Sequence, residues 1–105
     1  MTDPSVAPAS DVRDLTILPL KAVWKYPLVI TDRQPIALPA GAQIRTVQLQ
    51  AGVVCVWAEV EPAARLQPRT IVIVGTGHTL PTTALVYLGS VQQGPFVWHV
   101  YEEVA

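Results

Sequence analysis

The 105-residue sequence has few charged residues, and they form no run of one sign. Charged side chains make up 14% of the chain, with seven basic and eight acidic residues and a formal net charge of −1 at pH 7. The basic residues are scattered: Arg13, Lys21, Lys25, Arg33, Arg45, Arg65 and Arg69. Because a protein that binds a phosphate backbone needs a basic patch or stripe, we expect no nucleic-acid partner.

Cysteine and long apolar runs are also scarce. The single cysteine, Cys55, excludes an intramolecular disulfide and fits a reducing compartment. No apolar run approaches the ~20 residues that cross a bilayer, so we expect no membrane span and no membrane partner. Residues 1–14 contain no basic segment followed by an apolar core. We therefore expect no signal peptide and a cytoplasmic location.

Apolar residues, in contrast, are abundant for so short a chain. They make up half of the sequence, and the mean hydropathy is +0.36. A chain of this length forms one domain whose core buries roughly 60–65% of the surface of the unfolded chain. The apolar excess predicts that part of the surface is covered by a second subunit or a docked partner, so we expect a homo-oligomer.

Helix-forming patterns are missing as well, because prolines interrupt every segment that would otherwise suit an amphipathic helix. Short segments typical of strands recur instead, roughly every 8–12 residues with turn signals between them. Strands are expected at residues 22–28, 35–38, 43–50, 53–60, 71–74, 85–92 and 95–104. The sequence thus predicts an all-β domain over residues 21–105, a small antiparallel β-sandwich or barrel. A flexible, proline-rich arm over residues 1–20 is expected to precede it.

Three of these segments give more specific expectations. Pro27 marks the first strand as an edge strand or a bulged one, because proline lacks the N–H that a central strand needs. Residues 53–60, VVCVWAEV, are apolar on both faces, which indicates the centre of a sandwich or a subunit interface. Strict alternation in residues 43–50 places Ile44 and Val47 on opposite faces. Residues 61–68 are expected to form a loop.

The segment IVIVGTGHTLP, residues 71–81, carries the most distinctive pattern. A dinucleotide-binding fingerprint needs a further glycine where Leu80 occurs, followed by a helix, and a Walker loop needs a lysine. We therefore interpret the segment as a tight turn at a strand end, in which Gly75 and Gly77 adopt positive φ. The open alternative is a nest in which backbone N–H groups and His78 bind an anion or a small polar ligand.

No other residues combine into a recognisable catalytic or metal site. His78 and His99 are the only histidines, and their spacing matches no zinc signature, so we predict no metal site. Cys55 lies between valines within a strand, where cysteine behaves as a small hydrophobic residue. Without a partnered nucleophile we predict that the protein is not an enzyme and uses no cofactor. Strand aromatics such as Trp57 belong mostly to cores, although some line ligand grooves.

A series of short motifs runs from residue 22 to residue 103. They are WKYP (24–27), ITD (30–32), LPAGA (38–42), VQLQ (47–50), VWA (56–58), GTGH (75–78), YLG (87–89) and FVWHV (96–100). In this order they resemble a family of small proteins encoded by bacteriophages and prophages, the DUF7352-type domain of unknown function. The resemblance implies a phage or prophage origin and a compact domain, and it implies no activity. Because the GTGH motif is part of it, the ligand-nest hypothesis gains weight.

These observations favour a non-enzymatic, oligomeric binding module that captures a host protein or a small polar ligand, for example to counter host defence. The candidate ligand-binding residues are Gly75, Thr76, Gly77, His78, Trp57 and His99. Two alternatives stay open. One is a virion component, such as a head-decoration protein, that uses residues 1–20 as a clamp. The other is a hydrolase in which His78 acts as a general base.

Overall fold

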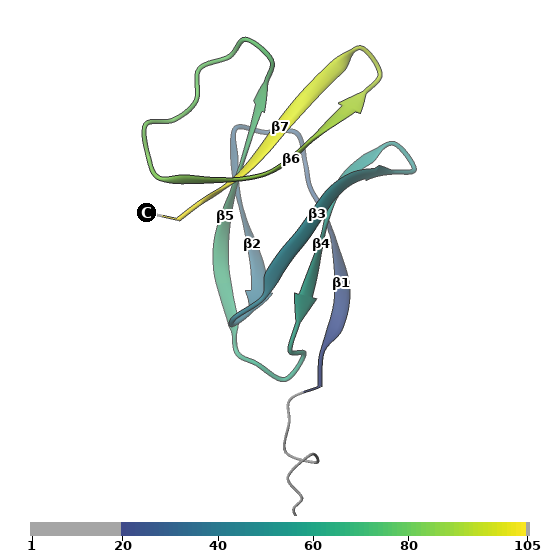
Figure 1. The fold of residues 1–105 in the computed structure, drawn as a ribbon, viewed down its shortest axis with the longest axis vertical. Coiled ribbons are helices and arrows are strands. Elements are labelled where there is room, and N and C mark those ends of the chain that lie inside the picture. Colours follow the sequence, from purple (N-terminus) through teal and green to yellow (C-terminus); the bar gives the residue numbers. More distant parts are fainter. Residues whose placement is uncertain (1–19, 105) are drawn as a thin grey trace, which may run out of the picture.

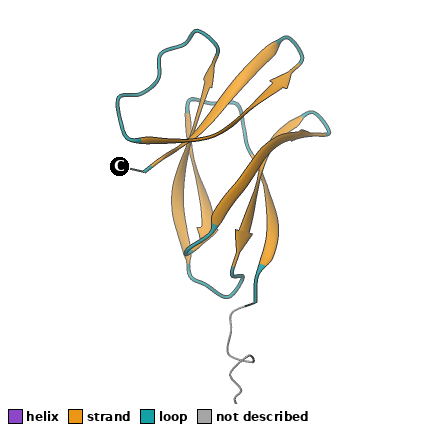
Figure 2. Cartoon of the chain, viewed as in Figure 1, coloured by secondary structure: helices purple, strands orange, loops and turns teal. Residues whose placement is uncertain are grey.

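Residues 20–104, the part of the chain that this computed structural model describes, form seven β-strands and no helix (Figure 2). The strands are β1 (Ala22–Pro27), β2 (Arg33–Pro39), β3 (Gln43–Gln50), β4 (Val53–Val60), β5 (Leu66–Gly75), β6 (Leu85–Gln93) and β7 (Phe96–Glu103). The predicted all-β class is therefore confirmed. The arm predicted for residues 1–20 lies, except for Leu20, outside the described residues. Over the described range, the structure contains no helix long and apolar enough to span a membrane.

The strands form two antiparallel sheets that pack face to face (Figure 1). The first has the order β1-β4-β3 and the second the order β2-β5-β7-β6. Strand β3 of the first sheet lies against β6 of the second. Strand β4 is central, as its apolar sequence predicts, and β1, which contains Pro27, is an edge strand. The fold is thus a small antiparallel sandwich.

The core lies between the two sheets and consists of side chains at alternate strand positions. On β4 these are Val54, Val56, Ala58 and Val60, none of them more than 1% exposed. They pack together with the other buried residues of the two core clusters: Leu28, Leu38, Ala42, Val47, Ile71, Ile73 and Val100. Valine and isoleucine dominate because their branched side chains fit the pleated inner faces of packed sheets.

Two irregularities change which residues face this core. A β-bulge in β3 between Ile44 and Thr46 adds one residue to the strand, so both Ile44 and Val47 pack into the core. The expectation that strict alternation separates these two side chains is therefore wrong. A second irregularity in β6 lies between Tyr87 and Gly89. Gly89 has a φ of +157°, and a Cβ at this position would lie 3.3 Å from Cβ of Val47.

Strands β2 and β5 are longer than the sequence predicts. Their register runs from Arg33 opposite Val72 to Pro39 opposite Leu66, so part of the predicted loop at residues 61–68 belongs to β5. The strand continues through Pro68 because β7 pairs with β5 only from Thr70 onward. An N–H at position 68 would point toward β7, but β7 has no residue opposite Pro68, so no hydrogen bond is lost there.

Candidate functional site

The GTGH segment forms a turn immediately after β5. The N–H of His78 donates a hydrogen bond to the carbonyl of Gly75 at 3.0 Å, and Gly77 has a φ of +90°. The turn interpretation is therefore confirmed for Gly77. It is wrong for Gly75, which does not have positive φ. Gly75 fits for a steric reason, since a Cβ there would lie 3.3 Å from the ring of Trp98 and 3.4 Å from Nδ1 of His78.

A groove of about 640 Å³ lies along the end of β5. Residues 30–33 before and at the start of β2 form one wall, and residues 78–81 of the β5–β6 loop form the other. Residues 72–75 of β5 and the ring of Trp98 complete the lining. The volume falls within the range of roughly 300–1,000 Å³ that is usual for ligand sites. The lining combines apolar side chains with Asp32, Arg33 and His78.

A second, smaller hollow of about 230 Å³ lies on the other side of His78. Its lining residues are Val74, Gly75, Thr76, Gly77, His78, Leu80, His99 and Tyr101. Both hollows share Val74, Gly75, His78 and Leu80, so the β5–β6 loop separates them. His78 therefore borders both hollows.

One edge of β5 continues past the end of its neighbour β2. The pairing of the two strands ends at Arg33 opposite Val72, and beyond it only the N–H of Ile73 reaches the turn, where it donates to the carbonyl of Asp32 at 3.2 Å. Both backbone groups of one residue point to the same side of an antiparallel strand, and the side alternates along the chain. The next groups on this edge are thus the carbonyl of Ile73 and the N–H of Gly75, which border the groove.

The charges at the groove are unequal. Arg33 donates from Nε and Nη2 to the carboxylate of Glu103 at 2.9 and 2.6 Å. This pair, followed by a hydrogen bond from Thr83, lowers the pKa of Glu103 to about 2. Asp32 forms no ion pair with any residue between 20 and 104. The groove therefore carries one uncompensated negative charge within the described part of the chain.

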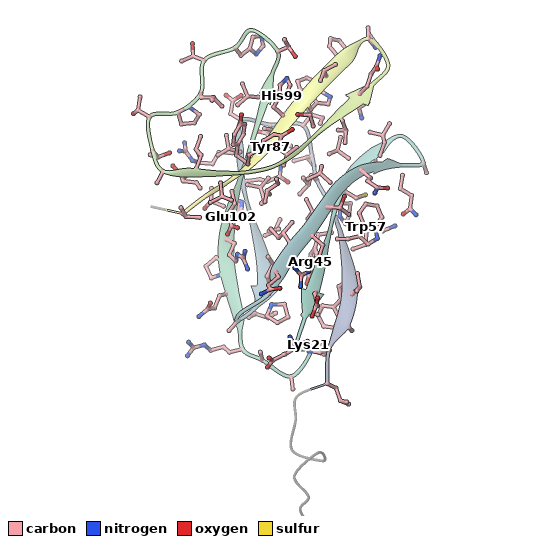
Figure 3. The ribbon with its side chains drawn as sticks, viewed as in Figure 1. Lys21, Arg45, Trp57, Tyr87, His99 and Glu102 are labelled. Atoms are coloured by element: carbon pink, nitrogen blue, oxygen red, sulfur yellow. The ribbon has the colours of Figure 1, made fainter. Side chains whose placement is uncertain are left out.

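His99 lies in a chain of hydrogen bonds on the outer face of the second sheet (Figure 3). Its Nδ1 is 2.7 Å from the hydroxyl of Ser90, which is 2.6 Å from the hydroxyl of Tyr87. Its Nε2 is 2.8 Å from the hydroxyl of Thr76. If Tyr87 donates to Ser90 and Ser90 donates to Nδ1, then Nε2 carries the proton and donates to Thr76. The chain fixes the orientation of the imidazole and connects the GTGH turn to β6 and β7.

The structure brings five of the six predicted site residues together. Gly75, Thr76, Gly77, His78 and His99 all line the smaller hollow. Trp57 lies on β4 in the first sheet, between Lys25 of β1 and Thr46 of β3, and shares no hollow with them (Figure 3). Between residues 20 and 104, no group of three or more histidine, cysteine, aspartate or glutamate side chains is placed to hold a metal ion.

Sequence reasoning missed the residues that complete the site. Ser90 and Tyr87 meet His99 only through the register of β6 and β7, in which Ser90 lies opposite His99. Asp32 reaches the groove because the turn before β2 lies beside the end of β5, and Trp98 reaches it because β7 places Trp98 opposite Gly75. Asp32 and Trp98 do belong to the motif series, in ITD (30–32) and FVWHV (96–100). That both motifs occur in the series was the one signal in the sequence that could have pointed to these two residues.

Comparison with known proteins gives one match. A family model described as a domain of unknown function (DUF7352) covers residues 19–105. No curated protein matches the chain, and no solved structure matches it.

Proposed function

Since the chain belongs to the DUF7352 family of domains of unknown function, we propose a function from the site itself: a non-enzymatic binding module whose ligand lies in the groove at the end of β5. The ligand is a segment of a host protein or a small polar molecule. The observation that carries this proposal is the groove of about 640 Å³, in which Asp32 and His78 flank apolar walls. Ligand sites typically combine such apolar walls with a few polar groups that orient the ligand.

The proposal also includes the origin of the protein, its location and its oligomeric state. The order of motifs supports a phage or prophage origin and, with it, action in the host cytoplasm. Oligomerisation is supported by large apolar side chains that are exposed on the described surface, among them Val23, Val29, Leu66, Val86 and Phe96. A second copy or a host protein that covers them would remove this surface from water.

Native mass spectrometry tests the binding function. Full-length protein is mixed with a defined set of small polar compounds and short peptides, and retained mass is recorded for each subunit. The matched variants are Leu80→Asp, in the loop that lines both hollows, and Leu49→Asp, at a leucine of similar exposure (37% against 41%) on β3 of the other sheet. We expect added mass in wild type and Leu49→Asp but not in Leu80→Asp. Absence of any retained compound, or equal retention by both variants, would contradict the proposal.

One observation favours a hydrolase as the second candidate, and it transfers the role of base from His78 to His99. The hydroxyl of Ser90 is 2.7 Å from Nδ1 of His99, as in a serine nucleophile and its base. No described carboxylate orients this imidazole, because its Nε2 faces Thr76 instead. If the pair is catalytic, the Ser90 hydroxyl loses its proton to His99 and takes the acetyl group of 4-nitrophenyl acetate, which releases 4-nitrophenolate; mass spectrometry should find the acetyl group on Ser90 in wild type, and Ser90→Ala should lose the release of 4-nitrophenolate. An unmodified Ser90 would remove this candidate.

The alternative of a virion component depends on residues 1–20, of which all but Leu20 lie outside the described residues. Detection of the protein in purified virus particles would support it.

A further inference from the structure

We infer that the occupant of the groove is an extended segment of a partner protein, which pairs with the edge of β5 that β2 leaves unpaired, as an added strand. This inference rests on the proposed function, because both place the ligand in the same groove. It names the partner class: a short polypeptide stretch with a basic side chain near one end.

The backbone of β5 provides the pairing groups. No described strand occupies the side of β5 at residues 73–75, where the carbonyl of Ile73 and the N–H of Gly75 border the groove. A peptide in the groove occupies the place that β2 would fill if it began a few residues earlier. Strand addition of this kind obtains affinity from main-chain hydrogen bonds and specificity from pockets for alternate side chains.

Residues 73–75 of β5 carry no proline, no charged side chain and no bulge. Exposed edges are commonly protected by proline, by charged residues or by a bulge. The last residues of β5 are Ile73, Val74 and Gly75, and the register of β5 with β7 is continuous there. The walls at residues 30–33 and 78–81 leave a groove along the edge and do not close it.

The charge of the groove selects the peptide. Arg33 is paired with Glu103, whereas Asp32 has no ion pair with a described residue. The N–H of Ile73 already donates a hydrogen bond to the carbonyl of Asp32. Asp32 therefore lies at the end of the groove next to β2. A lysine or arginine at the corresponding end of the peptide would therefore meet the carboxylate. Apolar side chains at alternate positions would meet the wall formed by Leu80 and Pro81.

The test uses dye-labelled pools of acetylated pentapeptide amides, each with one residue fixed at one position, and fluorescence anisotropy with full-length protein. We expect the strongest binding from pools with a basic residue fixed near one end. For the best peptide, N-methylation of the amide that pairs with the carbonyl of Ile73 should lower affinity at least about tenfold, which corresponds to ~1.4 kcal/mol. N-methylation of the adjacent amide, which points away, should change affinity less than about threefold. Asp32→Asn should weaken the basic peptides without weakening neutral ones.

A second readout reports strand pairing directly. Hydrogen exchange of the Gly75 amide should slow in the presence of the best peptide and not with its N-methylated form. Failure of every pool to bind, or an equal effect of the two methylations, would overturn strand addition. If no peptide binds but small polar compounds are retained by wild type and lost in Leu80→Asp, only the peptide inference fails. If neither class binds, the proposed function fails as well.

Discussion

At the scale of single residues, Glu103 is expected to control part of the acid stability. The hydrogen bonds from Arg33, and then from Thr83, lower its pKa to about 2, whereas an unfolded glutamate has a pKa of about 4.3. Between these two values the unfolded chain binds more protons, so the contribution of Glu103 is present above about pH 4.3 and is lost as the pH falls toward 2. We expect urea midpoints of wild type and Glu103→Gln to converge over this interval. A difference that stays constant from about pH 6 to pH 2.5 would contradict this linkage.

The hydroxyl of Tyr26, in contrast, is expected to lower the stability of the fold. Its ring packs against both core clusters, but its hydroxyl is buried and forms no hydrogen bond with a described residue. Burial also raises its pKa. Because an unpaired buried hydroxyl costs about 1–3 kcal/mol, Tyr26→Phe should leave the free energy of unfolding unchanged or raise it by ~1 kcal/mol. Tyr26→Ala, which leaves a cavity, should lower it by about 3 kcal/mol in the same urea titration. A clear loss of stability in Tyr26→Phe would show that the hydroxyl has a partner.

At the scale of elements, the contact of β3 with β6 depends on Gly89. An alanine there would have to adopt the φ of +157° and would place its Cβ 3.3 Å from Val47. We expect Gly89→Ala to lower the free energy of unfolding by about 2–3 kcal/mol, from backbone strain together with overpacking. Gly94→Ala is the matched control, because Gly94 also has positive φ, at +57°, but open space around it. If both variants lose the same stability in denaturant titrations, the sheets are not in close contact at Gly89.

The elements also show why part of the fold could be predicted from the sequence. Alternation, apolar runs and turn residues located all seven strands, because burial of one face leaves a period of two and burial of both faces leaves a continuous apolar run. The start of β5 was missed because residues 61–68 were predicted as a loop, and the continuation of the strand through Pro68 depends on where β7 ends. The bulge at Ile44 was missed because it is fixed by pairing with β4 and not by local sequence.

At the scale of the whole molecule, the candidate site is an assembly of distant segments. The sequence singled out residues 75–78 and His99, which the fold does place together. It gave no basis for placing the turn at residues 30–33 beside them, because that contact depends on the order β2-β5-β7-β6. It also gave no basis for separating Trp57 from the site, since an aromatic residue in a strand has the same pattern in either sheet.

Binding of a ligand in the groove at the end of β5 can be tested at every backbone position at once. The most direct measurement is a map of backbone amide shifts in full-length, ¹⁵N-labelled protein as the best peptide or retained compound is added. We expect the largest shifts on residues 30–33 and 72–81, with Lys25, Thr46 and Trp57 of the other sheet unchanged. Shifts concentrated on the β1-β4-β3 sheet, with the amides of Gly75 and His78 unaffected, would contradict it.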